Sequence, residues 1–184
     1  MWKKLQRLPR GPIVAHPLGA TLLMLAAGGA LAQTIDYQII YTDVGAGLQS
    51  NLCRARLSTG AHGGVTVRIA SSDTNLVRVT DDANLAGGEY ADIFVPNGGL
   101  NADFYLQAIE DTTGAVDLTA SAPGFADEIL AISVVTPALR KLGLPSQLSP
   151  LDPVDPFHLQ VGVANPLQTS ISYPQKVRVG GPGL

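Results

Sequence analysis

Residues 64–135 repeat one pattern, in which runs of four to seven alternating apolar and polar residues are separated by breaks rich in Gly, Pro, Asn, Asp and Ser. A sheet that is packed on one face buries every second side chain, so this alternation predicts β-strands. The breaks predict tight turns, because Gly tolerates positive φ and Pro lacks the N–H that a sheet ladder needs. The pattern predicts seven or eight short strands, which two packed sheets accommodate better than one open sheet. We therefore expect an all-β antiparallel β-sandwich.

The alternation also predicts which side chains point into the sandwich. It is clearest at Val65, Val67 and Ile69, which alternate with Thr66 and Arg68. Further strands are expected at residues 34–42, 52–58, 77–79, 89–95, 104–108, 116–120 and 129–135. The aliphatic set expected to be shared between the two sheets is Val65, Val67, Ile69, Ile93, Leu106, Leu118 and Ile132.

The first 32 residues have the pattern of a signal peptide. A basic start, with Lys3, Lys4, Arg7 and Arg10, precedes an uncharged apolar run over residues 18–32. The run ends in Ala30-Leu31-Ala32, the small-x-small pattern that signal peptidase needs, so cleavage is expected after Ala32. An uncleaved membrane anchor is the alternative, although the run is shorter than the roughly 20 residues of a transmembrane helix. The sequence predicts an exported protein, periplasmic, on the cell surface or extracellular, with no membrane insertion after cleavage.

Cleavage would leave an acidic chain with eight Lys and Arg against fifteen Asp and Glu, a net charge of −7. Such a surface repels phosphate backbones and anionic membranes, so no nucleic-acid partner is expected. The single cysteine, Cys53, has no disulfide partner within the chain, so stability must come from the apolar core. We expect a buried, inert thiol, because a nucleophilic role would need His62 or His158 beside it.

Two segments resemble a known family. The run from Gly63 through Ser71-Ser72-Asp73 to residues 76–79 resembles the first half of the bacterial immunoglobulin-like repeats of large exported proteins. The second half also matches, with Pro96 ending a strand, residues 104–106 on the next, and residues 119–125 (TASAPGF) before a valine-rich strand. The resemblance covers about residues 45–137 and implies an immunoglobulin-like sandwich without specifying a ligand. Antibody domains fit less well, because the mature chain would have neither paired cysteines nor Trp.

Four segments are predicted along the chain: a signal peptide at 1–32, an immunoglobulin-like β-sandwich at 33–138, a Pro-rich linker at 139–160, and the start of an incomplete second repeat at 161–184. Four prolines within residues 144–156 favour an extended connector. The repeat is suggested by Val161-Gly162 and residues 167–170, which echo Val44-Gly45 and residues 48–51. A chance echo is the alternative. A true repeat would make neighbouring domains of a tandem array the expected partners.

The chain contains no Gly-x-Ser-x-Gly, Cys-x-x-Cys, His-Glu-x-x-His or Gly-rich phosphate-binding motif. We therefore predict no catalytic residue, no cofactor and no metal site. Carboxylates at Asp73, Asp81, Asp82 and residues 127–128 are candidate Ca²⁺ ligands, but their spacing matches no calcium loop, and solvated turn residues are the simpler interpretation. His62 stands beside a Gly-Gly turn and is expected to be a turn residue.

The one candidate ligand surface is aromatic. Tyr90 and Phe94 are expected to share an outward face with Asp92, and Tyr105 is expected on a neighbouring strand. Such a strip suits stacking on a sugar or contact with a surface protein, and equally contact with an adjacent domain. The sequence thus predicts a non-catalytic exported spacer or display module, and the alternative is an adhesin or carbohydrate-binding module that uses the aromatic strip.

Overall fold

The computed structural model describes residues 32–39, 41–143 and 158–181. Every regular element in these ranges is a β-strand, which confirms the all-β class. Residues 1–31 of the predicted signal peptide and residues 144–157 of the predicted linker lie outside the described residues, as do residues 182–184 of the predicted second repeat. In the described ranges no helix is long and apolar enough to cross a bilayer.

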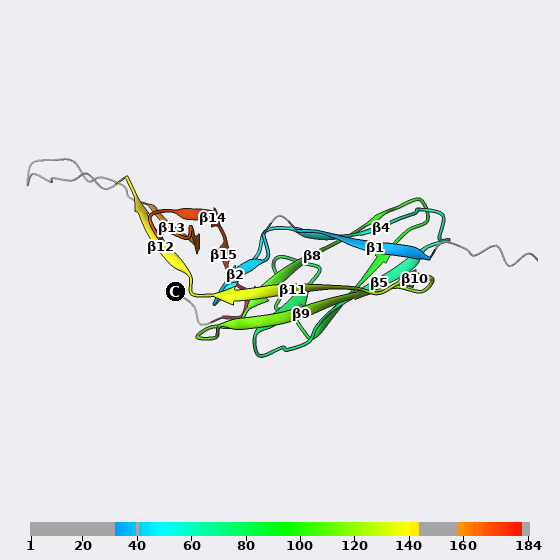
Figure 1. Ribbon diagram of the computed structural model, residues 1–184, viewed down its shortest axis with the longest axis horizontal. Helices are drawn as coiled ribbons and strands as arrows, with labels where there is room; N and C mark the ends of the chain where they lie inside the picture. Colours follow the sequence, from blue (N-terminus) through cyan, green and yellow to red (C-terminus); the bar gives the residue numbers. More distant parts are fainter. Residues whose placement is uncertain (1–31, 40, 144–157, 182–184) are drawn as a thin grey trace, which may run out of the picture. The chain divides into compact units, whose positions relative to one another are not determined.

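Seven strands form the first layer, here called sheet I (Figure 1). The order is β10-β1-β4-β8-β3-β15, and β6 also pairs with β8. The strands are β1 (Gln33–Gln38), β3 (Leu48–Gln49), β4 (Cys53–Leu57), β6 (Val77–Thr80), β8 (Asn101–Ala108), β10 (Phe125–Ala126) and β15 (Lys176–Val177).

Five strands form the second layer, here called sheet II, in the order β2-β11-β9-β5-β7. They are β2 (Asp43–Gly45), β5 (Val65–Ser71), β7 (Tyr90–Val95), β9 (Gly114–Ser121) and β11 (Glu128–Val135). All pairs within this sheet are antiparallel except β2 with β11, which is parallel. Two packed, mainly antiparallel sheets confirm the predicted β-sandwich.

The core lies between the two sheets and is built from the inward positions that the alternation predicts. Six of the seven aliphatic residues expected there are buried, and the seventh, Ile93, is partly buried and packs against the same cluster. The largest fully buried side chain is Phe104 of β8, whose ring meets that of Tyr37 edge-on with centroids 6.2 Å apart. Alternation identifies these positions because the long strands, such as β5, bury one face and expose the other to solvent.

The leading segment does not form the single strand that the sequence suggests for residues 34–42. β1 ends at Gln38, and the chain then crosses to sheet II, where β2 begins at Asp43. Tyr41 lies in this crossing with 46% of its surface exposed. A strand that changes sheets must interrupt its ladder, so its alternation cannot continue through the crossing.

A third, smaller sheet follows the sandwich and contains β12 (Ala138–Leu142), β13 (His158–Ala164) and β14 (Ile171–Pro174). Ala138, the first residue of β12, ends the predicted sandwich. The rest of β12 and the start of β13 lie in the predicted linker, and the rest of β13 and β14 lie in the predicted second repeat. A second repeat at residues 161–184 stays a prediction.

Residues 175–178, here called the strap, return from this small sheet to the sandwich. β15 pairs with β3, and Arg178 forms a two-pronged ion pair with Glu110, with Nε–Oε1 and Nη2–Oε2 distances of 2.7 and 2.6 Å. Just before the strap, the ring of Tyr173 stacks on that of Tyr41 with centroids 3.7 Å apart. The strap therefore binds to the end of the sandwich where β11 finishes.

The ion pair makes strap docking sensitive to acid. Hydrogen bonds from Arg178 lower the pKa of Glu110 below its ordinary value of 4.5. A carboxylate with a lowered pKa in the folded state stabilises that state above its ordinary pKa and loses the contribution as pH falls through the lowered value. We expect amide exchange in residues 176–178 to speed up below about pH 4, relative to β5, after correction for intrinsic rates. Glu110→Gln should remove that pH dependence, and equal acid sensitivity in both proteins would contradict this role.

Candidate functional site

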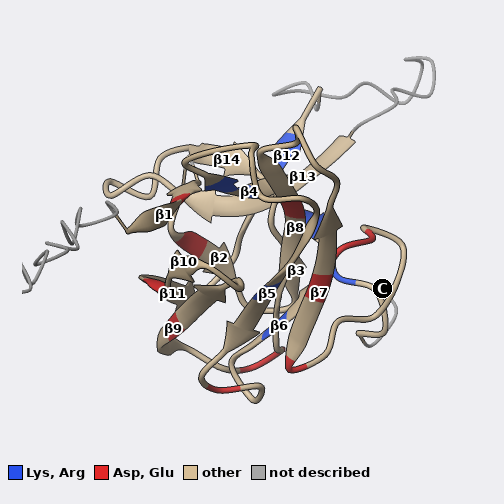
Figure 2. Cartoon of the chain, turned by 90° about the vertical axis from the view of Figure 1, so that its right-hand side faces the viewer, with Lys and Arg blue, Asp and Glu red and all other residues tan. Residues whose placement is uncertain are grey.

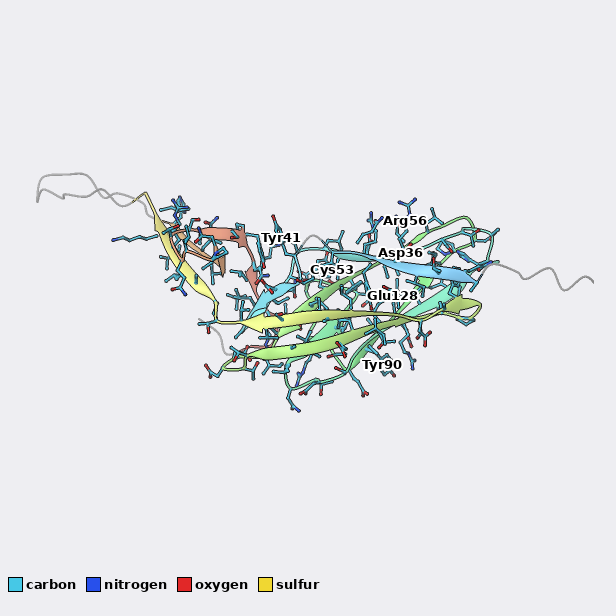
Figure 3. The ribbon with its side chains drawn as sticks, in the orientation of Figure 1. Asp36, Tyr41, Cys53, Arg56, Tyr90 and Glu128 are labelled. Atoms are coloured by element: carbon cyan, nitrogen blue, oxygen red, sulfur yellow. The ribbon has the colours of Figure 1, made fainter. Side chains whose placement is uncertain are left out.

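The outer surface of sheet II carries the aromatic residues singled out in the sequence. Tyr90 and Phe94 of β7 are 48% and 67% exposed. Figure 3 shows Tyr90 projecting away from the sandwich. Together with Asp92 of β7 and Thr66 and Arg68 of β5 they form what we call the aromatic face. The predicted outward orientation of Tyr90 and Phe94 is therefore present in the structure.

The register between β5 and β7 positions these side chains. Arg68 lies opposite Asp92, and Thr66 lies opposite Phe94. The turn before β5 requires glycine, since Gly64 has a φ of 96° and a Cβ there would be 3.2 Å from the Phe94 ring. Because glycine has no Cβ atom, the Phe94 ring can lie against the backbone of this turn.

Arg68 of β5 contacts both Asp92 and Tyr90 of β7. Its Nε and Nη2 each donate to an Asp92 carboxylate oxygen at 2.7 Å, and its guanidinium carbon lies 4.1 Å from the centre of the Tyr90 ring. Hydrogen bonding to Arg68 lowers the pKa of Asp92, and the same bonds raise the pKa of Arg68. Both groups stay charged at neutral pH, and Arg68 is fixed by a planar fork and by a cation–π contact.

A shallow groove runs beside this ion pair. Thr66 and Ser121 provide hydroxyl groups along it, and Pro123 and Asp127 complete its wall. Exposed rings next to a rigid guanidinium–carboxylate pair and hydroxyls can stack on a flat ligand face while hydrogen bonding to its edge. The face is suited to reversible contact with a polar surface.

The structure does not bring Tyr105 to the aromatic face. Tyr105 belongs to β8 in sheet I, where it lies opposite Thr80 of β6, whereas β7 pairs with β5 in sheet II. Its neighbours in sequence, Phe104 and Leu106, point into the core, so Tyr105 points out of the opposite layer. The expected strip of three aromatic residues is thus two residues, because the strand after β7 joins the other sheet.

Cys53 is buried, as the sequence predicts. Its Sγ lies 3.4 Å from both the Ser50 hydroxyl and the Asn51 carbonyl oxygen. Burial raises the pKa of the thiol to about 11. The cavity beside it, also lined by Tyr41 and Tyr173, has a volume of ≈ 50 Å³, which is room for a few water molecules. The thiol therefore stays protonated and shielded.

The other polar candidates act in turns. His62 Nδ1 accepts from the Gly64 N–H at 3.1 Å, and Nε2 lies 3.0 Å from the Gly99 carbonyl oxygen, which fits the predicted turn role. Asp73 and Asp82 each accept from the backbone N–H two residues ahead at 2.8 Å. In the part of the chain that the structure describes, no three His, Cys, Asp or Glu side chains cluster as metal ligands.

Sequence reasoning missed the contacts that fix these surfaces. Alternation indicates that Arg68 points outward, but its pairing with Asp92 depends on the register between strands 24 residues apart in the sequence. Alternation gives the face of a strand and not its partner, so only the matched positions of opposite charge on two strands hinted at this pair.

No protein-family model matches this chain, and no curated protein matches it.

Proposed function

We propose that the chain is a non-catalytic, exported, immunoglobulin-like module that serves as a structural spacer or display domain in a tandem array. The observation that carries the proposal is the path of the chain, which enters the sandwich at one end and leaves it at the other.

Strand order supports the immunoglobulin-like subtype. Sheet I contains β1-β4-β8-β6 and sheet II contains β11-β9-β5, which correspond to the ABED and GFC sheets of constant-type immunoglobulin domains. The order along the chain also agrees. β7 is an extra edge strand beside β5, inserted between β6 and β8.

The two chain ends of the sandwich are far apart. Gln33 pairs with Phe125, shortly before β11 starts at Glu128. β11 then runs to Val135, where the chain leaves, and its seven residue steps span roughly 23 Å at strand spacing. A module of this kind holds whatever precedes and follows it on opposite sides.

The leading segment resists being drawn out along that axis. β2 pairs in parallel with β11, with Val44 opposite Val134. Backbone bonds of 2.9 Å from Ser133 N–H to the Thr42 carbonyl and 2.8 Å from Ala46 N–H to the Val135 carbonyl flank the pair. Tension on the two ends would pull these parallel strands in opposite directions, so the bonds are loaded together instead of one after another. The strap also fixes the chain to the sandwich just beyond β11.

We expect the chain to unfold at a higher force when it is stretched end to end than when it is unzipped. Single-molecule stretching with handles at Gln33 and beyond β11 loads the β2–β11 bonds in shear. The comparison places handles at Gln33 and at Asp127→Cys, which lie at the same end of the sandwich. The free thiol of Cys53 does not interfere, since it is buried. An end-to-end force equal to or below the unzipping force would overturn the spacer proposal.

A second candidate function, favoured by the exposed aromatic face, is carbohydrate binding in an adhesin-like role. Tyr90→Ala and Phe94→Ala should each abolish detectable glycan binding while the melting temperature stays unchanged, because both rings are exposed. Tyr105→Ala, on the other sheet, is the matched control and should leave binding intact. A glycan array without hits for the unmodified chain would end this alternative.

A further inference from the structure

The two edge strands of sheet II, β2 and β7, differ in whether their outward backbone groups are hydrogen-bonded. Those of β2 are hydrogen-bonded. Gln175 of the strap lies beside this strand, where its Oε1 accepts from the Gly45 N–H at 2.9 Å and its Nε2 donates to the Asp43 carbonyl at 3.1 Å. Gln175 is itself buried. One side-chain amide thus takes the place of a neighbouring strand and closes this edge.

Among the residues that the structure describes, none caps the β7 edge in this way. The Ser71 N–H donates to the Glu89 carbonyl, so antiparallel alternation directs the backbone groups of Ala91, Ile93 and Val95 toward β5. The N–H and C=O groups of the exposed residues Tyr90, Asp92 and Phe94 therefore point away from the sheet. Within the described ranges no strand pairs with that side of β7, and Figure 2 shows β7 at the border of the sheet.

Other exposed edges carry features that discourage pairing. β12 has Arg140 and Lys141, β14 is short and ends at Pro174, and β6 is bridged at Val79 by Gly88 through two bonds of 2.9 Å. Charge, proline and local covering are the usual protections of an edge strand. On β7 the single charge, Asp92, is neutralised by its bidentate pair with Arg68. The β7 edge is therefore six residues long, aromatic and electrically balanced.

We propose that β7 pairs antiparallel with β7 of a second copy of this chain, about a two-fold axis at Asp92. The two aromatic residues stand two positions before and two positions after Asp92, so this register places Tyr90 of each copy opposite Phe94 of the other. Every outward N–H and C=O of the three exposed residues then finds a partner. The pairing joins two five-stranded sheets into one continuous sheet.

The chemistry of the strand selects a second copy over an unrelated peptide. Aromatic pairs directly across two strands stabilise a sheet, and the symmetric register forms such a pair twice. The opposed Asp92 carboxylates would repel, but each is already paired with Arg68 of its own copy. The contact is one strand wide, so a reversible dimer that depends on concentration is expected.

Charges introduced at positions 90 and 94 test both the pairing of β7 with β7 and its register. The unmodified chain should shift from monomer to dimer with rising concentration in sedimentation velocity. Tyr90→Lys/Phe94→Lys places like charges opposite each other and should leave only monomer. Tyr90→Lys/Phe94→Glu places opposite charges across the same positions and should restore the dimer. Tyr105→Lys on sheet I is the control and should dimerise like the unmodified chain.

Three results would overturn the proposal: an unmodified chain that stays monomeric at all concentrations, a dimer that survives the Lys/Lys pair of substitutions, or no return of the dimer with the Lys/Glu pair. Thermal melts check that both double variants fold, since the substituted side chains are exposed. Both variants lack the two rings, so loss of glycan binding would be the same in each. The difference between them therefore reports the pairing of copies alone.

Discussion

Phe104→Ala should lower the free energy of unfolding by about 3–5 kcal/mol, the usual cost of removing a fully buried phenylalanine ring. Phe104 has 0% of its surface exposed and lies in the middle of β8, between the two sheets. Its loss removes the edge-on contact with Tyr37 and leaves a cavity that rigid strands on both sides cannot close. Urea unfolding followed by circular dichroism measures the change.

Phe94→Ala is the matched control, because it deletes the same ring from the outer surface of the sandwich. We expect its effect to stay within about 0.5 kcal/mol, as for most exposed positions. The two substitutions together test the layered architecture. Equal losses of stability at Phe104 and Phe94 would contradict the assignment of inner and outer faces.

Gln107→Leu should cost about 3 kcal/mol although it preserves the size of the side chain, since buried polar groups left without partners cost about 1–3 kcal/mol each. The side chain of Gln107 has no exposed surface. Its Nε2 donates to Gln49 Oε1 at 2.7 Å and to the Leu85 carbonyl at 2.8 Å, and its Oε1 accepts from the Gly87 N–H at 2.7 Å. The network fixes the loop between β6 and β7 to the outer side of sheet I.

Gln38→Leu is the control for this prediction, because Gln38 is an exposed residue of β1. Its substitution should leave the urea midpoint nearly unchanged. Amide exchange at Gly87 should rise strongly in Gln107→Leu and stay unchanged in Gln38→Leu. A Gln107→Leu protein as stable as the unmodified chain would show that the loop is held by other contacts.

The fold class was accessible from the sequence because each strand has one dry face, and alternation records that face directly. Val65, Val67 and Ile69 are buried as expected, while Tyr90 and Phe94 are exposed as expected. Strand partners were less accessible. Tyr105 was expected near Phe94, but the strand that follows β7 belongs to the other sheet, and no local pattern reveals which sheet a strand joins.

Contacts between distant segments were the least predictable. Gln175 caps a strand 130 residues away, and Arg178 pairs with Glu110 across 68 residues. A lone glutamine or arginine in a polar stretch has the same appearance whether it is solvated or buried by the fold. The candidate surface could thus be located to a strand, but not completed, from the sequence.

The glutamine that caps β2 has a consequence for assembly. A chain shortened before residue 175 would have sheet II open at both borders, and every molecule that joined one border would present the other to the next. Closed pairs would then give way to open-ended filaments. The side-chain amide of Gln175, by covering β2, accordingly limits the proposed assembly to pairs of copies.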